Sequence, residues 1–195
     1  MKRLSGVDRR RQIIEAAQAV ILQKGLAQAA TRDVTGRLGV GSGLLHHYFK
    51  SWPILRAEAV RQAVLDEIEQ FETVLAATKA ADRVDRLVDW MADDGDMRHW
   101  SLWLNAVDEA RRDPELRVVV HEAYAQWHAA MARALQGMLD AGIGRCPDPS
   151  AAAWRLCALI DGLAGTVLLG DGVMAMAAAK GLLRDQFALE LDLDP

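Results

Sequence analysis

Cysteine is scarce in this chain of 195 residues, which contains only Cys146 and Cys157. Two cysteines cannot form the framework of disulfide bridges that stabilises many small secreted proteins. The fold must therefore depend on a hydrophobic core, and 51% of the residues are hydrophobic, which is enough material for one. Cys157 lies within an apolar stretch, so we expect it to be a small core residue.

Segments that direct a chain to or across a membrane are also lacking. No run reaches the roughly 20 apolar residues that span a bilayer, and the N-terminal sequence MKRLSGVDRRRQ has no apolar signal core. We therefore expect a cytoplasmic protein that makes no contact with membranes.

The residue spacings of metal, cofactor and catalytic sites are absent as well. His46 and His47 are adjacent, so on a helix they point about 100° apart, which suits a single metal ion poorly. The glycines at 39, 41 and 43 follow no strand and precede no Gly-Lys-Ser/Thr, so they do not form a phosphate-binding loop. We expect no metal, no cofactor and no enzymatic activity.

The formal net charge of −4 hides a strong asymmetry. Residues 1–61 contain eleven Lys and Arg and four acidic residues, a balance of +7, whereas the remainder carries −11. This distribution predicts a basic head that contacts a polyanion and an acidic body that does not. The alternative is uneven surface charge without a function. Arg9, Arg10 and Arg11 lie at the start of the first predicted helix, where they either contact phosphate or form a solvated basic helix end.

Residues 31–51, TRDVTGRLGVGSGLLHHYFKS, predict two short helices joined by a tight turn. Thr31 suits an N-cap, and Val34 and Leu38 lie on one helix face at i, i+4. The sequence Gly-Val-Gly at 39–41 then interrupts the pattern, and a second helix runs from about Ser42 to Phe49. This layout is typical of a helix-turn-helix, whose second helix enters the major groove of DNA.

Apolar periodicity and capping signals predict about nine helices and no strand, so the expected fold class is all-α. A three-helix head at 1–52 should precede a helical ligand-binding and dimerisation body at 53–195. Besides the two helices above, the expected ranges are 8–24 (capped by Asp8), 51–78, 81–91, 97–111, 113–139 (Asp113-Pro114 start) and 148–169 (Asp148-Pro149 start). A ninth helix should follow the Gly-Asp-Gly break at 170–172 and run to about 189.

The N-terminal third resembles the TetR family of transcriptional regulators. The residues that carry this resemblance are AAQAVILQKG in the first helix and ATRDVTGRLGVGSGLLHHYFKS after it. The ending HHYF, together with WSLWLNAVDEARRDPELR and ALIDGLAG in the body, is similar to the BetI-type branch, whose namesake responds to choline. The resemblance implies a homodimer joined through the eighth and ninth helices, with a ligand pocket among helices four to eight.

Two positions depart from the pattern of the family. Gly41 replaces the usual Ser that caps the recognition helix, so either Ser42 caps instead or the cap is weaker. Trp52 stands where the family commonly has a Lys that contacts phosphate, and Lys50 and Arg56 are alternatives for that contact.

By position in the family pattern, nine residues are predicted to contact DNA, whereas Leu45 and Phe49 pack inward. Arg32 can read guanine, and Thr31 can bind phosphate at a helix N-terminus; the alternative for each residue is ordinary exposure to solvent. The nine residues are Thr31, Arg32, Ser42, Gly43, Leu44, His46, His47, Tyr48 and Lys50.

Most of the tryptophans fall in the predicted body, where aromatic faces can attract a cation, with Asp108, Glu109 or Asp161 as acidic neighbours. The alternative is an ordinary aromatic core. The predicted ligand-binding residues are Trp90, Trp100, Trp103, Tyr124, Trp127, His128 and Asp161. The predicted dimer interface contains Trp154, Cys157, Gly162, Gly165 and Leu168, since small residues let helices pack closely.

The function expected from these features is a ligand-responsive regulator, most simply a repressor. As a dimer it would bind a pseudo-palindromic double-stranded DNA operator, and a cationic or aromatic small molecule would release it. The alternative is a helical small-molecule-binding protein or enzyme whose N-terminal bundle is only structural.

Overall fold

The computed structural model describes residues 5–91, 97–170 and 172–193. Over these ranges the chain forms nine α-helices and one 3₁₀ helix and contains no strand, which confirms the all-α prediction. The helices are α1 (Gly6–Lys24), α2 (Thr31–Leu38), α3 (Ser42–Tyr48), α4 (Trp52–Ala77), α5 (Arg83–Met91), α6 (Arg98–Glu109), α7 (Pro114–Asp140), α8 (Pro149–Leu168) and α9 (Met176–Leu191), with the 3₁₀ helix at Ala80–Asp82. The predicted polar loop at 92–96 lies outside the described residues.

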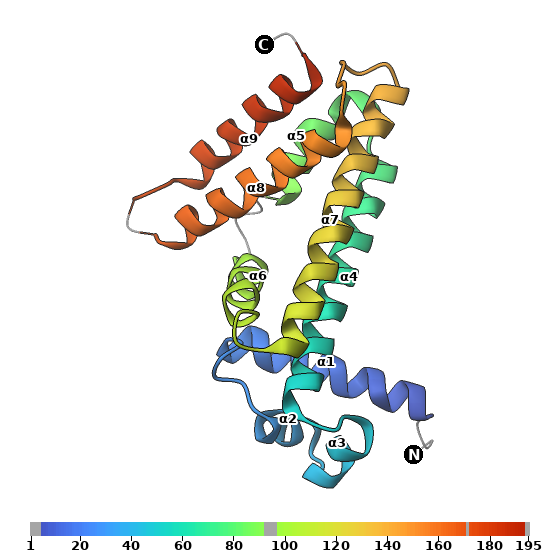
Figure 1. The fold of residues 1–195 in the computed structure, drawn as a ribbon, viewed down its shortest axis with the longest axis vertical. Helices are drawn as coiled ribbons and strands as arrows, with labels where there is room; N and C mark the ends of the chain where they lie inside the picture. The colour runs from blue at the N-terminus through green and yellow to red at the C-terminus, as the bar shows by residue number, and fades with distance from the viewer. Residues whose placement is uncertain (1–4, 92–96, 171, 194–195) are drawn as a thin grey trace. The chain divides into compact units, whose positions relative to one another are not determined.

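The helices divide into two compact units. Unit 1 comprises residues 1–65 and 101–123, and unit 2 comprises residues 66–100 and 124–195, so α4, α6 and α7 contribute to both. The predicted boundary between residues 52 and 53 remains a prediction about how the chain is organised. In unit 1, α1, α2 and α3 form a three-helix head (Figure 1).

Helix starts follow the capping rules, although two predicted caps are wrong. Helix α1 begins after Ser5, whose Oγ accepts the backbone N–H of Asp8 (3.1 Å), so Asp8 lies inside the helix. Helix α2 begins after Ala30, and the Asp33 carboxylate accepts the Ala30 N–H (3.0 Å), so Thr31 is the first helical residue instead of the cap. In both cases a residue three positions downstream completes the cap, as in a capping box.

The two predicted Asp-Pro starts are confirmed. Asp113 accepts the backbone N–H groups of Glu115 (2.9 Å) and Leu116 (3.2 Å) at the start of α7. Asp148 accepts the N–H of Ala151 (3.0 Å) at the start of α8. These acceptors satisfy N–H groups that the first turn of a helix leaves without partners.

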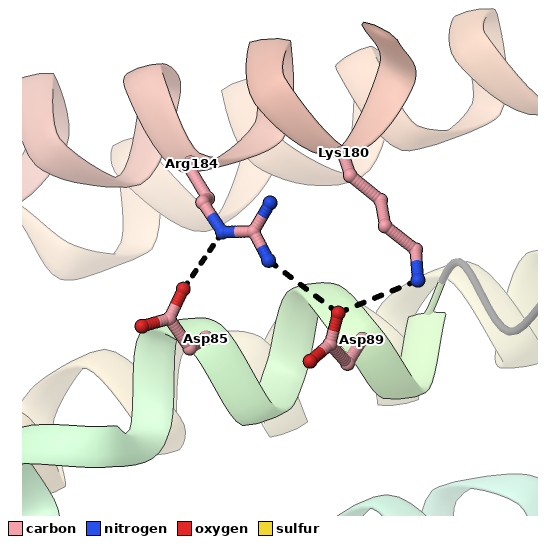
Figure 2. Close-up of polar contacts among 4 residues, drawn as sticks. All are labelled: Asp85, Asp89, Lys180 and Arg184. Atoms are coloured by element: carbon pink, nitrogen blue, oxygen red, sulfur yellow. Dashed lines mark hydrogen bonds and ion pairs between the residues drawn. The ribbon is translucent and has the colours of Figure 1, made fainter. Parts of the chain in front are cut away.

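In unit 2, α9 runs beside α8 and is tied to α5 (Figure 1). Four side chains form a polar cluster between α5 and α9 (Figure 2). Arg184 Nε contacts Asp85 at 2.7 Å, while its Nη2 and Lys180 Nζ each lie 3.4 Å from Asp89. Leu87 and Val88 of α5 are fully buried, so α5 is fixed by apolar packing as well as by these ion pairs.

The sequence was expected to contain no segment long and apolar enough to span a bilayer, and helix α8 is an exception to that expectation. Residues 149–168, with a mean hydropathy of 1.4 over their most apolar stretch, are long and apolar enough to cross a membrane. Only 28% of that stretch is buried within this chain. Length and composition alone are weak evidence for a membrane span, because helices that pack in protein interfaces share both properties.

Candidate functional site

Helix α3, the predicted recognition helix, is anchored in the core of unit 1. Leu45 is 2% exposed and Phe49 is 4% exposed, and the backbone N–H of Phe49 donates to the Leu45 carbonyl (2.8 Å) where the helix ends. Val34 of α2 is fully buried. Because the apolar face of α3 points inward, the side chains on its opposite face are exposed to solvent.

The residues predicted to contact DNA all lie at or near the surface of the head, and none of them is buried. The exposed ones are Arg32, Ser42, Gly43, His46, His47 and Lys50, and the partly exposed ones are Thr31, Leu44 and Tyr48. The Tyr48 ring meets His47 edge-on, with 5.0 Å between ring centroids. Their contact with DNA remains a prediction.

The start of α3 resolves the alternatives for its cap. Gly41 is the N-cap residue and provides no side-chain hydrogen bond, and Ser42 is the first residue of the helix. Of the two alternatives, the structure therefore supports a cap at Gly41 that is weaker than the usual Ser cap. A side chain at position 41 would meet open space, since no atom lies within 4 Å of a Cβ built there.

The arginines at the start of α1 have partners within the protein. Arg10 pairs with Glu58 (3.1 Å), and its guanidinium lies 5.0 Å from the centre of the Phe49 ring. Arg11 lies 3.5 Å from Asp8, and Arg9 donates to Gln12 (2.6 Å). Arg10 thus has a structural role, joining α1 to α4 and to the end of α3.

Arg56 is not available for the phosphate contact that the sequence left open. Its side chain is only 13% exposed, and it pairs with Asp113 at 2.5 Å. Lys50 is the remaining alternative, because it is exposed and has no ion pair among the residues described. Arg32 is exposed and equally unpaired over the same ranges.

Arg37, in the last turn of α2, is a further candidate that the sequence reading missed. It is exposed, and no acidic partner lies near it in the part of the chain that the structure describes. The only signal in the sequence was the net charge of the head.

In unit 2, three aromatic rings form what we call the Trp90 cluster: Phe71 of α4, Trp90 of α5 and Trp127 of α7. The Phe71 centroid lies 5.6 Å from Trp90 and 5.3 Å from Trp127, and the two tryptophans are 6.2 Å apart. Phe71 is fully buried, whereas both tryptophans are partly exposed. The structure therefore brings two predicted ligand residues together.

A second group, which we call the His128 stack, joins α7 to α8. The His128 ring stacks on Tyr124, with 5.8 Å between ring centroids, and on Trp154, with 3.5 Å between centroids. The Tyr124 hydroxyl donates to the Asp161 carboxylate (3.2 Å). Trp154, a predicted interface residue, thus stacks on His128, a predicted ligand residue.

Burial controls the protonation of the His128 stack. Burial and then the nearby Asp161 carboxylate raise the pKa of Tyr124 to about 12, and the same two causes raise the pKa of Cys157 to about 12. Burial lowers the pKa of His128, although the Tyr124 carbonyl and Asp161 oppose the shift. At neutral pH the phenol and the thiol are therefore protonated, and burial favours the neutral form of His128.

The remaining predicted residues lie on α6 and α8. Trp100 and Trp103 are half-buried on α6. On α8, Gly162 is exposed and Cys157, Gly165 and Leu168 are half-buried. Asp108 and Glu109 belong to unit 1, where both lie near Arg112, whereas Asp161 accepts a hydrogen bond from the Tyr124 hydroxyl in unit 2.

One carboxylate near the Trp90 cluster was missed by the sequence reading. Glu67 of α4 precedes Phe71 by one helical turn, and its Oε1 lies 3.9 Å from His99 Nδ1. Burial raises the pKa of Glu67, while His99 opposes the shift. Nothing in the local sequence distinguishes Glu67 from the acidic residues on either side of it.

Comparisons with known proteins agree with this arrangement. Residues 13–51 match the bacterial regulatory proteins of the tetR family, and residues 80–192 match the C-terminal region of BetI-type transcriptional repressors. The HTH-type transcriptional regulator BetI of Agrobacterium fabrum is 29% identical over 195 residues, which covers 96% of this chain and 90% of that protein.

Two solved structures with bound small molecules are similar over nearly the whole chain. One is a transcriptional regulator from Saccharomonospora viridis in complex with choline, with a TM-score of 0.79 and 28% identity, covering 94% of this chain and 96% of that one. The other is the multidrug binding protein EbrR complexed with proflavin, with a TM-score of 0.66 and 30% identity, covering 91% and 99%. The chain therefore belongs to the TetR family, with a BetI-type C-terminal region, and is a DNA-binding transcriptional regulator and not an enzyme.

Proposed function

We propose that this regulator is a homodimeric repressor that binds a pseudo-palindromic operator through α3 and leaves it when a small cation binds in unit 2. Two heads related by a two-fold axis would read half-sites one helical turn or more apart. Because its operator is chromosomal DNA, the protein would act in the cytoplasm.

The observation that carries this proposal is the two-sided character of α3. Its inner face is held by buried Leu45 and Phe49, and its outer face presents Ser42, His46 and His47 to solvent. Arg32 and Lys50 lie at either end of the motif, and neither forms an ion pair within 4.0 Å among the described residues. A guanidinium that is not already paired can bind guanine in a bidentate manner, and such a contact discriminates by about 1–3 kcal/mol.

The dimer is proposed on α8 and α9. Their large apolar side chains remain exposed in a single chain: Trp154 is 56% exposed, Leu182 44% and Leu189 75%. Exposed Gly162 would allow close approach of a second helix. A second copy of α8 and α9 would remove this apolar surface from water.

The effector is proposed to be a small organic cation. Trp, Tyr and Phe faces attract quaternary ammonium groups, and the Trp90 cluster and the His128 stack both lie in unit 2, with Asp161 and Glu67 as carboxylates beside them. Choline and proflavin, which occupy two similar proteins, are both cations. A coupling of about 1–3 kcal/mol between effector and operator would lower DNA affinity some 5- to 150-fold.

The test is titration of the purified protein into fluorescent DNA from upstream of its own gene, at two salt concentrations, with unrelated DNA as the comparison. Selective binding that weakens steeply with salt is expected, since lysine and arginine contacts to phosphate release counterions. Arg32→Ala and His47→Ala should each weaken operator binding and leave thermal unfolding unchanged, because both side chains are exposed.

Arg117→Ala is the matched control, because Arg117 is an exposed arginine outside α2 and α3. Equal loss of affinity in Arg117→Ala and Arg32→Ala would contradict a specific role for Arg32. Genome-wide selection of bound fragments identifies the operator if the upstream DNA does not contain it. The absence of any selectively bound fragment would refute the proposal.

Sedimentation of the Trp154→Asp variant tests the dimer, which should dissociate.

A further inference from the structure

Glu67 is a carboxylate in unit 2 with little compensation for its charge. Among the described residues its one ion-pair partner is the imidazole of His99, which carries a charge only when protonated and whose Nδ1 is 3.9 Å away, too far for a hydrogen bond. The side chain is 29% exposed, so water reaches only part of it. Burial accordingly raises the pKa of Glu67 above its usual value. A carboxylate in this condition gains stability from any cation that approaches it.

The position of Glu67 on α4 puts it next to aromatic rings. Residues four apart on a helix share a face, with about 5–6 Å between their Cβ atoms, so Glu67 adjoins Phe71. Phe71 in turn contacts Trp90 and Trp127 in the Trp90 cluster, with centroids 5.6 and 5.3 Å away. The carboxylate of Glu67 thus lies one helical turn from Phe71, the residue at which rings from three helices meet.

Rings beside a carboxylate form the combination that recognises an organic ammonium ion. The rings bind the alkyl groups and the diffuse positive charge, and the carboxylate supplies the counter-charge. We propose that Glu67 is the residue that recognises the positive charge of the effector, taking it up next to the Trp90 cluster in place of His99. This inference rests on the proposed function, because it names the residue through which that effector is selected.

Asp161 is the competing carboxylate in the same unit. It already accepts a hydrogen bond from the Tyr124 hydroxyl (3.2 Å), which stabilises its charge. An incoming cation would therefore gain less at Asp161 than at Glu67. The His128 stack, to which Asp161 belongs, also includes Trp154, which is 56% exposed on the face that we assign to the dimer.

The experiment measures binding of choline, of tetramethylammonium and of 3,3-dimethylbutan-1-ol, a neutral molecule of the shape of choline, by tryptophan fluorescence and calorimetry. Glu67→Gln should weaken both cations at least tenfold and leave the neutral alcohol unchanged. His99→Gln, which removes the competing partner, should not weaken choline. Since burial disfavours the charged form of Glu67, Glu67→Gln should unfold at the same temperature as the wild type or higher.

Glu69→Gln is the matched control, because Glu69 is an exposed glutamate on the same helix, and Asp161→Asn tests the rival site. Equal choline affinity in the wild type and Glu67→Gln would overturn the inference. A tenfold loss of choline affinity confined to Asp161→Asn would also overturn it, as would failure of the wild type to bind either cation. Operator titration of the same samples separates this failure from that of the proposed function, because a wild type that binds its operator but no cation is still a regulator.

Discussion

Replacement of Asp113 should be among the most destabilising substitutions in unit 1. The side chain is 7% exposed and acts twice: it accepts two backbone N–H groups at the start of α7, and it pairs with Arg56 of α4. Arg56 is itself only 13% exposed. Asp113→Ala therefore removes a cap and leaves a largely buried guanidinium without its partner.

The size of the effect follows from these two roles. Loss of one partner of a buried ion pair costs about 3–5 kcal/mol, and the lower end applies because Arg56 retains some contact with water. Loss of an N-cap costs about 1 kcal/mol. We expect Asp113→Ala to lower the free energy of unfolding by about 4 kcal/mol. Asp113→Asn keeps an oxygen that can cap the helix, so it should lose about 3 kcal/mol.

The dependence on pH gives a second test of the same pair. Burial alone would raise the pKa of Asp113, but the hydrogen bond from Arg56 and the N–H groups of Leu116 and Glu115 outweigh it and hold the pKa below the usual value. A group whose folded pKa is depressed contributes stability above its unfolded pKa, about 3.9 for Asp, and loses it as pH falls through the folded pKa. The wild type and Asp113→Asn should therefore differ fully at pH 7 and converge below about pH 4.

Urea unfolding followed by circular dichroism measures these differences, with Asp108→Asn as control. Asp108 pairs with Arg112 on the surface, where the side chains are 60% and 68% exposed, so this variant should stay within about 0.5 kcal/mol of the wild type. A loss of less than 1 kcal/mol for Asp113→Ala, or a pH-independent gap between the wild type and Asp113→Asn, would refute the reasoning.

Three smaller predictions concern single contacts, each measured by urea unfolding. Gly144→Ala should cost more than Gly142→Ala: both have positive φ (+68° and +79°), but a Cβ at 144 would collide with the Leu191 carbonyl while one at 142 meets nothing, and equal losses would contradict this. Asp89→Asn, which removes two exposed ion pairs to α9 (Figure 2), should cost at most about 1 kcal/mol, and an effect that persists in 1 M salt would argue against an electrostatic cause. Gly41→Ser should stabilise the protein by a few tenths of a kcal/mol, since Ser can cap α3 in the open space there, and a measurable loss would show that the cap is constrained.

The helix boundaries that were best predicted are those set by residues adjacent in the sequence. Asp113-Pro114 and Asp148-Pro149 each contain a cap and a first-turn proline, so α7 and α8 begin where they were expected. Helix α1 ends at Lys24 as predicted, and Gly25 follows it with φ +84°, a conformation that few other residues adopt.

The two wrong caps show how close alternatives arise within one turn. Ser5 and Asp8 are both good capping residues by type, and they hydrogen-bond to each other, but Ser5 is the one that caps the helix. At α2, Thr31 was the better cap by residue type. The cap is nevertheless Ala30, one residue before Thr31. The Asp33 carboxylate accepts the Ala30 N–H and also pairs with Lys24 of α1 (2.6 Å).

Charged side chains were the hardest to assign from sequence, because their partners come from distant positions. Arg10 and Arg32 look alike in a basic head, yet Arg10 pairs with Glu58, 48 positions away, and Arg32 forms no ion pair within 4.0 Å among the described residues. Likewise Arg56 pairs with Asp113 across 57 positions. Folding thus divides the positive charge of the head into a paired set that joins helices and an unpaired set that remains available to phosphate. The net charge of +7 in residues 1–61 overstates what DNA can use, so the salt dependence of operator binding should reflect the unpaired set and not the total.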